Sequence, residues 1–115
     1  MPPGPRTGTG FFSGIETAHQ VENLDRIEAL DKKGPTINSV ISINPQALAE
    51  ADRLDAAYKA TGFTGPLHGI PILVKDEVDA AGMATTLGTL VFKDYKPTRD
   101  AFPVAQLRKQ GAIIL

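Results

Sequence analysis

At 115 residues, the chain has room for one small domain. Hydrophobic residues make up 42% of it and charged residues 22%, a composition that favours a globular protein and excludes a disordered one. The formal net charge is −1 and basic residues form no long cluster, so we expect neither nucleic acid nor an anionic membrane as a partner. The absence of cysteine excludes disulfides, thiolate metal sites and cysteine nucleophiles.

Composition also constrains localisation and metal binding. The N-terminal sequence has neither the basic start nor the long apolar core of a secretory signal. No stretch approaches the roughly 18 continuous apolar residues of a membrane span. We therefore expect a cytoplasmic protein without a membrane span. A zinc site would need carboxylates beside His19 and His68, and neither histidine has a helical HxxxH partner, so no metal site is predicted.

The first third of the chain is predicted to contain an arm, a helix and a strand. Residues 1–15 are rich in proline and glycine and are expected to form a flexible arm. Residues 16–31 carry apolar side chains at every third position, which predicts a helix that stops before Gly34-Pro35. Residues 36–43 are rich in β-branched side chains and are predicted to form a strand. The predicted inward positions of the helix are Val21, Leu24, Ile27 and Leu30.

The middle of the chain contains the clearest helix and a short apolar strand. Asn44 is predicted to cap a helix that starts at Pro45 and ends at Gly62. A loop then leads to the strand of residues 70–74, which we expect to be buried on both faces because every residue in it is apolar. The inward face of the helix is predicted to carry Leu48, Ala51, Leu54 and Tyr58.

The last part of the chain is predicted to be a loop, a helix and a strand. Residues 80–99 are glycine-rich and irregular, Asp100 is expected to cap a helix over residues 101–110, and residues 112–115 start a strand. This alternation predicts an α/β layer whose parallel strands are covered on both faces. Since a stable domain rarely ends on an apolar strand, we expect the chain to be a fragment of a longer protein. The predicted inward side chains of the last helix are Phe102, Val104 and Leu107.

Lys75 follows the apolar strand at its carboxyl end, which is where α/β proteins place their active sites. Burial there would favour the neutral amine, which can take a proton from a hydroxyl and so activate a serine nucleophile. Alternation along the strand places Asp76 on the opposite face, where it could orient the loop that follows. The alternative is an ordinary strand-end lysine whose stem packs on the sheet and whose amine reaches water or an acid.

Other polar residues near this strand admit both a catalytic and a structural interpretation. The carboxylates of Asp76, Glu77 and Asp79 could form an acid–base pair, but their close spacing favours solvated turn residues. His68 could act as a general base, although a loop histidine beside a glycine is more often structural. Residues 85–89, TTLGT, could line a pocket with hydroxyls and amides or could form a simple turn.

Four stretches of the sequence closely resemble the N-terminal part of amidase signature enzymes. They occur in the family's order, and the resemblance covers about residues 16–115. Their residues are more similar to those of general amidases than to those of the amidotransferase subunit that amidates charged transfer RNA. The stretches are RIEALDKKGPTINSVISINPQALAEADRLD (residues 26–55), PLHGIPILVKD (66–76), AGMATTLGT (81–89) and TRDAFPVAQLRKQGAIIL (98–115).

This resemblance implies a hydrolase of non-peptide carboxylic amides, built on a large mixed sheet flanked by helices. In the family a lysine acts through a bridging serine on a nucleophilic serine, and the matching lysine here is Lys75. The resemblance further implies that Met83 and Thr86 line the substrate pocket. It implies no metal or organic cofactor and a small-molecule amide as the partner of the complete enzyme, and it leaves homodimer formation open.

The chain departs from the family pattern in its serines. Both triad serines and the glycine-serine-rich oxyanion segment are expected downstream of residue 115, while Ser13, Ser39 and Ser42 lack the glycine elbow of an activated nucleophile. Without those serines the chain is expected to be inactive, since loss of one triad member removes most of the catalysis. We therefore predict the N-terminal part of an amidase domain over residues 16–115. The alternative is a non-catalytic interaction module that pairs its open strand edge with a partner.

Overall fold

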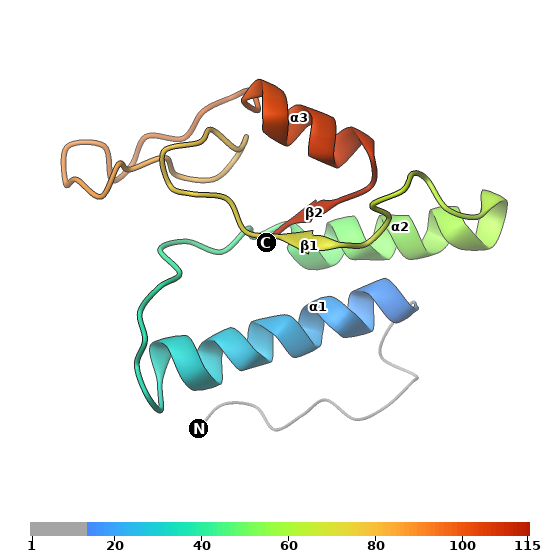
Figure 1. The fold of residues 1–115 in the computed structure, drawn as a ribbon, viewed down its shortest axis with the longest axis horizontal. Helices are drawn as coiled ribbons and strands as arrows, with labels where there is room; N and C mark the ends of the chain where they lie inside the picture. Colours follow the sequence, from blue (N-terminus) through green and yellow to red (C-terminus); the bar gives the residue numbers. More distant parts are fainter. Residues whose placement is uncertain (1–13) are drawn as a thin grey trace.

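The structure, a computed structural model, describes residues 14–115. Most of the arm predicted for residues 1–15 lies outside the described residues. Within residues 14–115, no helix has both the length and the apolar composition needed to cross a membrane. The elements in chain order are α1 (Ile15–Arg26), which continues into the π-helix η1 (Ile27–Lys32), α2 (Ala47–Thr61), β1 (Pro71–Ile72), α3 (Phe102–Lys109) and β2 (Ile113–Ile114) (Figure 1).

A parallel pair of strands, β1 and β2, lies at the centre of the fold. Pro71 is paired with Ile113 and Ile72 with Ile114, and the Ile113 N–H donates to the Ile70 carbonyl at 2.9 Å. Parallel strands need a long crossover, and here it contains α3. The parallel pairing predicted from the alternation of elements is therefore confirmed.

Helices cover both faces of this strand pair (Figure 1). Ile113 and Leu115 pack with Ala47 and Ala51 of α2 on one face. Ile114 points to the other face and packs with Val104 of α3. Because successive side chains of a strand alternate between its faces, residues 113–115 contribute side chains to two small apolar cores, one on each face. The residues that complete the first core are Leu24, Ile27 and Leu54, and those that complete the second are Ala80, Ile72, Val74, Val78 and Met83.

The first helix was predicted correctly, but one of its inward positions was wrong. Its last turn is the π-helix η1, in which the wider turn rotates the side chains relative to a regular helix. Leu30 is consequently 45% exposed, whereas the next residue, Asp31, is only 5% exposed. A buried carboxylate at this position requires hydrogen-bond donors, and the following segment supplies them.

The strand predicted for residues 36–43 is not formed. The segment is irregular, and Thr36 and Asn38 have positive φ values of 55° and 59°, which a strand does not contain. The β-branched side chains favour a strand only where a neighbouring strand can pair with it. Here the N–H groups of Ser39 and Val40 donate to the Asp31 carboxylate instead.

The helix α2 begins later than predicted and is capped differently. It starts at Ala47, and Asn44 accepts a hydrogen bond from the Gln46 N–H at 2.9 Å in the turn before it. Gly62, with φ +87°, follows its last residue as predicted. Tyr58 was predicted to face inward but is exposed.

Asp55 of α2 holds the start of α1. Its carboxylate accepts hydrogen bonds from the Glu16 and Thr17 N–H groups, each at 3.0 Å, and from the Thr17 hydroxyl at 2.7 Å. The residue before α1, Gly14, has no side chain to cap the helix. The free N–H groups and positive dipole end of α1 are therefore satisfied by a carboxylate from a neighbouring helix.

Two further predictions about burial were wrong. The strand of residues 70–74 is not buried on both faces, because Leu73 is 67% exposed and Ile70 is half-exposed. In α3, Val104 is buried as predicted, but Phe102 is 76% exposed. Asp100 makes no capping bond to α3 and accepts one from the Ala81 N–H at 2.7 Å instead.

Candidate active site

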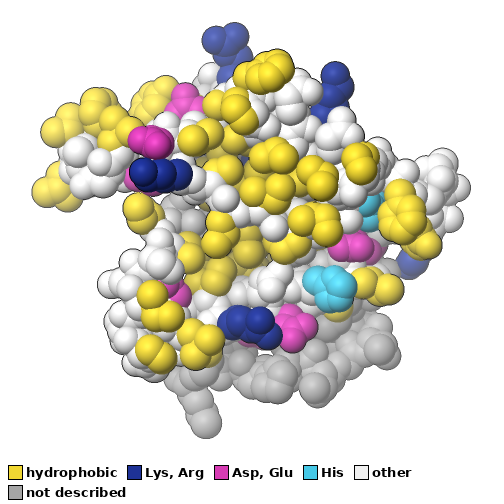
Figure 2. Space-filling model, viewed as in Figure 1, with side chains coloured by type: hydrophobic (Ala, Val, Ile, Leu, Met, Phe, Trp, Pro, Cys, Tyr) yellow, Lys and Arg dark blue, Asp and Glu magenta, His cyan; other side chains and the backbone are white. Residues whose placement is uncertain are grey.

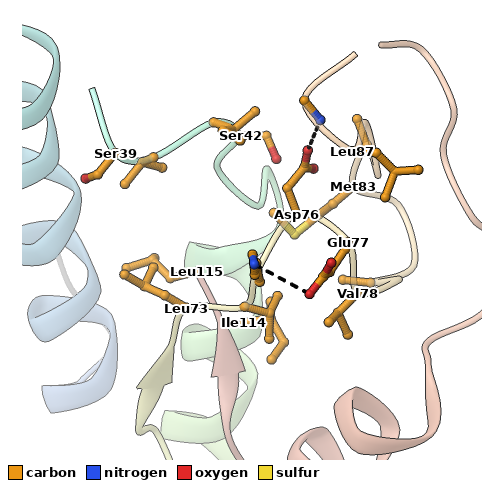
Figure 3. A pocket seen from close by; sticks show the side chains of 17 residues that line it. Ser39, Ser42, Leu73, Asp76, Glu77, Val78, Met83, Leu87, Ile114 and Leu115 are labelled. Carbon is orange, nitrogen blue, oxygen red and sulfur yellow. Dashed lines mark hydrogen bonds and ion pairs between the residues drawn. The ribbon is translucent and has the colours of Figure 1, made fainter. Parts of the chain in front are cut away.

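Lys75 lies three residues beyond the end of β1 and lines a cavity of about 540 Å³. Figure 3 shows this cavity with the side chains that line it. Three irregular segments surround this cavity together with the end of β2: residues 39–42, residues 73–78 and the loop that carries Met83 and Leu87. The carboxyl end of β1 therefore opens into a hollow with mixed apolar and polar walls, as expected of a ligand site in an α/β fold.

The burial expected for Lys75 is not present in this chain. Its side chain is 80% exposed, and its Nζ lies 3.7 Å from the Glu77 carboxylate, which is also largely exposed. An ion pair between exposed groups is weak because water and salt screen it. Within residues 14–115, the Lys75 amine thus reaches water and an acid, which is the arrangement of the alternative, an ordinary strand-end lysine.

The predicted pocket residues Met83 and Thr86 take different positions. Met83 lines the cavity. Thr86 instead binds Asp76, whose carboxylate accepts hydrogen bonds from the Thr86 hydroxyl and from the Thr86 N–H at 3.1 Å. The Asp76 carboxylate also accepts from the Gly88 N–H at 3.2 Å, the dashed line at Asp76 in Figure 3. The Thr86 hydroxyl, followed by these backbone groups, holds the pKa of Asp76 below its ordinary value. Asp76 thus orients the loop, as the sequence suggested.

The loop bound by Asp76 contains a tight turn over residues 86–89. The Thr89 N–H donates to the Thr86 carbonyl at 2.9 Å, and the two central residues, Leu87 and Gly88, have φ values of +54° and +69°. Two positive φ values inside such a hydrogen-bonded turn define type I′. The prediction of a turn at TTLGT is therefore confirmed. Leu87 and Gly88 both line the cavity.

The opposite wall, residues 39–42, is held by Asp31. Its carboxylate accepts from the Ser39 hydroxyl at 2.6 Å, from the Ser39 N–H at 2.6 Å and from the Val40 N–H at 3.2 Å. The Lys32 amine lies 3.2 Å from the same carboxylate. The Ser39 hydroxyl and N–H, with smaller contributions from Val40 and Lys32, hold the pKa of Asp31 far below its ordinary range. No local sequence pattern signals this wall, because its donors lie eight and nine residues after the acceptor in an irregular segment.

Backbone strain in the described residues is concentrated around this cavity. Among residues 14–115, the non-glycine residues with positive φ are Thr36, Asn38 and Leu87. The first two lie just before the Asp31-bound wall, and the third lies in the Asp76-bound turn. Such conformations persist only when surrounding contacts enforce them, and they occur preferentially at functional sites.

His68 lies outside this site and has a structural environment. It is buried, its Nδ1 accepts a hydrogen bond from the Thr64 N–H at 3.2 Å, and its ring packs against those of Tyr58 and Phe63. It does not line the Lys75 cavity. These contacts agree with the structural interpretation of this histidine.

Comparison with known proteins identifies the family. A family model described as "Amidase" matches residues 21–115, and the chain therefore belongs to the amidase family. It is 42% identical over 93 residues to a Mycobacterium bovis protein named "Putative amidase AmiD", a match that covers 80% of this chain and 19% of that protein. It is 36% identical over 114 residues to a Glutamyl-tRNA(Gln) amidotransferase subunit of Oleidesulfovibrio alaskensis, a match that covers 95% of this chain and 22% of that protein.

A solved structure supports the same assignment. The native peptide amidase from Stenotrophomonas maltophilia superimposes with a TM-score of 0.84 at 44% identity, over 87% of this chain and 20% of that one. The chain spans about a fifth of the length of these relatives. The α/β amidase-signature fold predicted from the sequence is thereby confirmed for the part that this chain contains. Because both an amidase and an amidotransferase match, the preference for a general amidase stays a prediction.

Proposed function

We propose that this chain is the N-terminal part of an amide hydrolase of the serine–serine–lysine type and that Lys75 is its catalytic base. One observation carries the proposal: in a chain of the amidase family, Lys75 follows the carboxyl end of β1 and lines a cavity there. The substrate class is a small carboxylic amide; Met83 would contact it from the cavity wall, and Thr86 would contribute through the turn that forms part of that wall. This mechanism needs no metal or organic cofactor.

The proposed chemistry begins with a proton transfer. The neutral amine of Lys75 takes a proton from a bridging serine, which in turn takes one from the nucleophilic serine. The nucleophile attacks the amide carbon, the C–N bond breaks as the leaving amine receives a proton, and water then hydrolyses the acyl-enzyme. Within the described residues the cavity offers Ser39 and Ser42, but the Ser39 hydroxyl already donates to Asp31. The resemblance places both catalytic serines beyond residue 115.

The exposure of Lys75 is consistent with this proposal if more of the amidase domain surrounds it. The matched segment of this chain makes up only 19–20% of these relatives, so they are more than four times as long as this chain. Further segments over the cavity would separate Lys75 from water and from Glu77, and burial of this kind favours the neutral amine that a base requires. We expect the isolated 115 residues to show no amidase activity.

The test uses the protein as its gene encodes it. A fluorophosphonate probe reports an activated serine without knowledge of the substrate, and ammonia release from a panel of aliphatic, aryl and fatty acyl amides reports turnover. Lys75→Ala is expected to reduce both by roughly a thousandfold or more. Lys109→Ala, which removes an exposed lysine of α3 that does not line the cavity, is the matched control. Full turnover in Lys75→Ala contradicts the assignment of the base.

Reading the transcript past the codon for Leu115 separates the proposal from its alternative. A reading frame that continues into a glycine-serine-rich segment supports the hydrolase. A stop codon at that point favours the non-catalytic interaction module, which would pair its open strand edge with a partner. The face shown in Figure 2 carries exposed hydrophobic side chains that such a partner would cover. We further propose that the protein is cytoplasmic and forms a homodimer. Light scattering of the purified protein tests for the dimer.

A further inference from the structure

We infer that Asp76 is a positioning residue for the proposed reaction: its carboxylate fixes the turn of residues 86–89, which forms one wall of the Lys75 cavity. The inference rests on the proposed function, because a wall matters for turnover only if the cavity binds the substrate. Asp76 follows Lys75 directly in the chain. One short stretch after β1 therefore carries the amine and also binds the wall formed by the turn of residues 86–89.

The anchoring contacts are specific to a carboxylate. The two oxygens of Asp76 accept from the Thr86 hydroxyl and from the N–H groups of Thr86 and Gly88. The donors are the first residue of the turn, Thr86, and its second central residue, Gly88, ten and twelve residues after the acceptor. Hydrogen bonds to a charged acceptor are roughly twice as strong as neutral ones. The lowered pKa of Asp76 agrees with this, since the bonds favour the ionised carboxylate.

The turn itself is unfavourable without this anchor. A type I′ turn favours Asn, Asp or Gly at its first central position, where this chain has Leu87 at φ +54°. A side chain with a Cβ is strained at positive φ. Leu87 is also more than half exposed, so burial of its side chain does not enforce the conformation. The Thr89 N–H closes the turn on the Thr86 carbonyl, and the carboxylate of Asp76 ties Thr86 and the central Gly88 to the strand-end segment.

Loss of the anchor should act on the cavity wall and not on the amine. Met83, Ala84, Leu87 and Gly88 bring this wall to the cavity. If the wall loosens, the substrate binds less tightly, while the proton transfer from the serines to Lys75 is little changed once the substrate is bound. A residue that acts on Lys75 directly would have the opposite effect, because it would change the ionisation of the amine.

The experiment measures the steady-state kinetics of Asp76→Asn in the protein as its gene encodes it. Asparagine keeps one acceptor oxygen, so the fold is retained while the charge and one oxygen are lost. We expect KM to rise about tenfold, kcat to change by less than about threefold, and the pH profile of kcat to stay in place. Asp52→Asn, on the exposed face of α2, is the matched control.

Two variants of Thr86 test the route of the effect. Thr86→Val removes the hydroxyl donor and is expected to give part of the rise in KM, whereas Thr86→Ser keeps the donor and restores the parent value. The double variant Asp76→Asn with Thr86→Val should raise KM by less than the product of the two single effects, because both remove the same contact. Hydrogen exchange at the Thr86 and Gly88 amides should be about tenfold faster in Asp76→Asn.

These measurements separate failure of the inference from failure of the proposed function. A fall in kcat with a shifted pH profile and unchanged KM overturns the positioning role. That result would mean that Asp76 acts on the ionisation of the Lys75 amine. Unchanged exchange at Thr86 and Gly88 in Asp76→Asn also overturns it. Turnover that survives Lys75→Ala defeats the proposed function, and the exchange rates then still decide whether Asp76 fixes the turn.

Discussion

Two irregular segments line the same cavity and are held in the same way. The segment of residues 36–42 and the turn of residues 86–89 each contain non-glycine residues with positive φ. Each donates two backbone N–H groups and one hydroxyl to a single aspartate, Asp31 for the first segment and Asp76 for the second. Asp31 lies in the last turn of η1, whereas Asp76 follows β1.

The two anchors differ in burial and in charge. Asp31 is buried at the end of η1, with the Lys32 amine 3.2 Å away. Asp76 is only half-buried, and no ion pair of residues 14–115 includes it. A buried carboxylate that loses its donors is strongly unfavourable, whereas a half-buried one can turn to water. The Asp31 wall is therefore part of the stability of the fold, and the Asp76 turn can be altered locally.

A third aspartate provides the reference for this comparison. Asp55 accepts two N–H groups and one hydroxyl at the start of α1, and it is buried between two helices. Asp55→Ala is expected to lower the free energy of unfolding by about 2–4 kcal/mol, because α1 loses its cap and two N–H groups lose their acceptor. Urea denaturation measures the loss, with Asp52→Ala as the control on the same helix. A loss no larger than the control's would show that this bonding pattern contributes little even when buried.

The next largest effect is expected from Asp31→Ala. It should lower the melting temperature clearly and speed exchange at the Ser39 and Val40 amides by roughly tenfold or more. Asp76→Ala should speed exchange at Thr86 and Gly88 but leave the melting temperature within about 2 °C. Calorimetry and hydrogen exchange on the same two variants make the measurement. Equal losses of melting temperature would contradict the distinction between the two walls.

The sequence predicted those parts of the fold that are determined by residues close together in the chain. The parallel strands, observed as the pairing of Pro71–Ile72 with Ile113–Ile114, and the helix between them were predictable, since apolar runs and the glycine after the helix signal them within a few residues. The position of Lys75 at the strand end followed from the same pattern. The conformation of residues 36–43 was not predictable, because β-branched side chains signal a strand whether or not a partner strand exists.

Burial was the least predictable property. The period of α3 indicated an inward face, but Phe102 is exposed and Val104 is buried, because the contact with Ile114 selects the side of the helix. The exposure of Lys75 likewise depends on what covers the cavity, which no local pattern encodes. The Asp31 anchor was hidden because a π turn, and not a regular helix, places its carboxylate inward.

As the pH falls, Asp76 and Asp31 should be protonated one after the other, and the cavity wall that each holds should loosen at that point. The pKa of both aspartates is lowered in the folded state by hydrogen bonds, and Asp31 has in addition the Lys32 amine beside its carboxylate. A lowered folded pKa stabilises the protein above the unfolded value of about 3.9, and this stabilisation is lost as pH falls through the folded pKa. Asp76 should therefore be protonated first. Carboxyl NMR titration measures the order, and Asp31→Asn should flatten the loss of stability below pH 4. Protonation of Asp31 before Asp76 would contradict the prediction.

The smallest effect is expected from Lys32, the cation beside the buried anchor. Its amine also donates to the Val40 carbonyl, but its side chain is 35% exposed, so solvent screens the pair with Asp31. Lys32→Met keeps the apolar stem and should lower the free energy of unfolding by less than about 1 kcal/mol, a difference that should vanish in high salt. Urea denaturation at two salt concentrations measures it. A loss as large as that of Asp31→Ala would mean that the cation, and not the hydrogen bonds to the carboxylate, holds this wall.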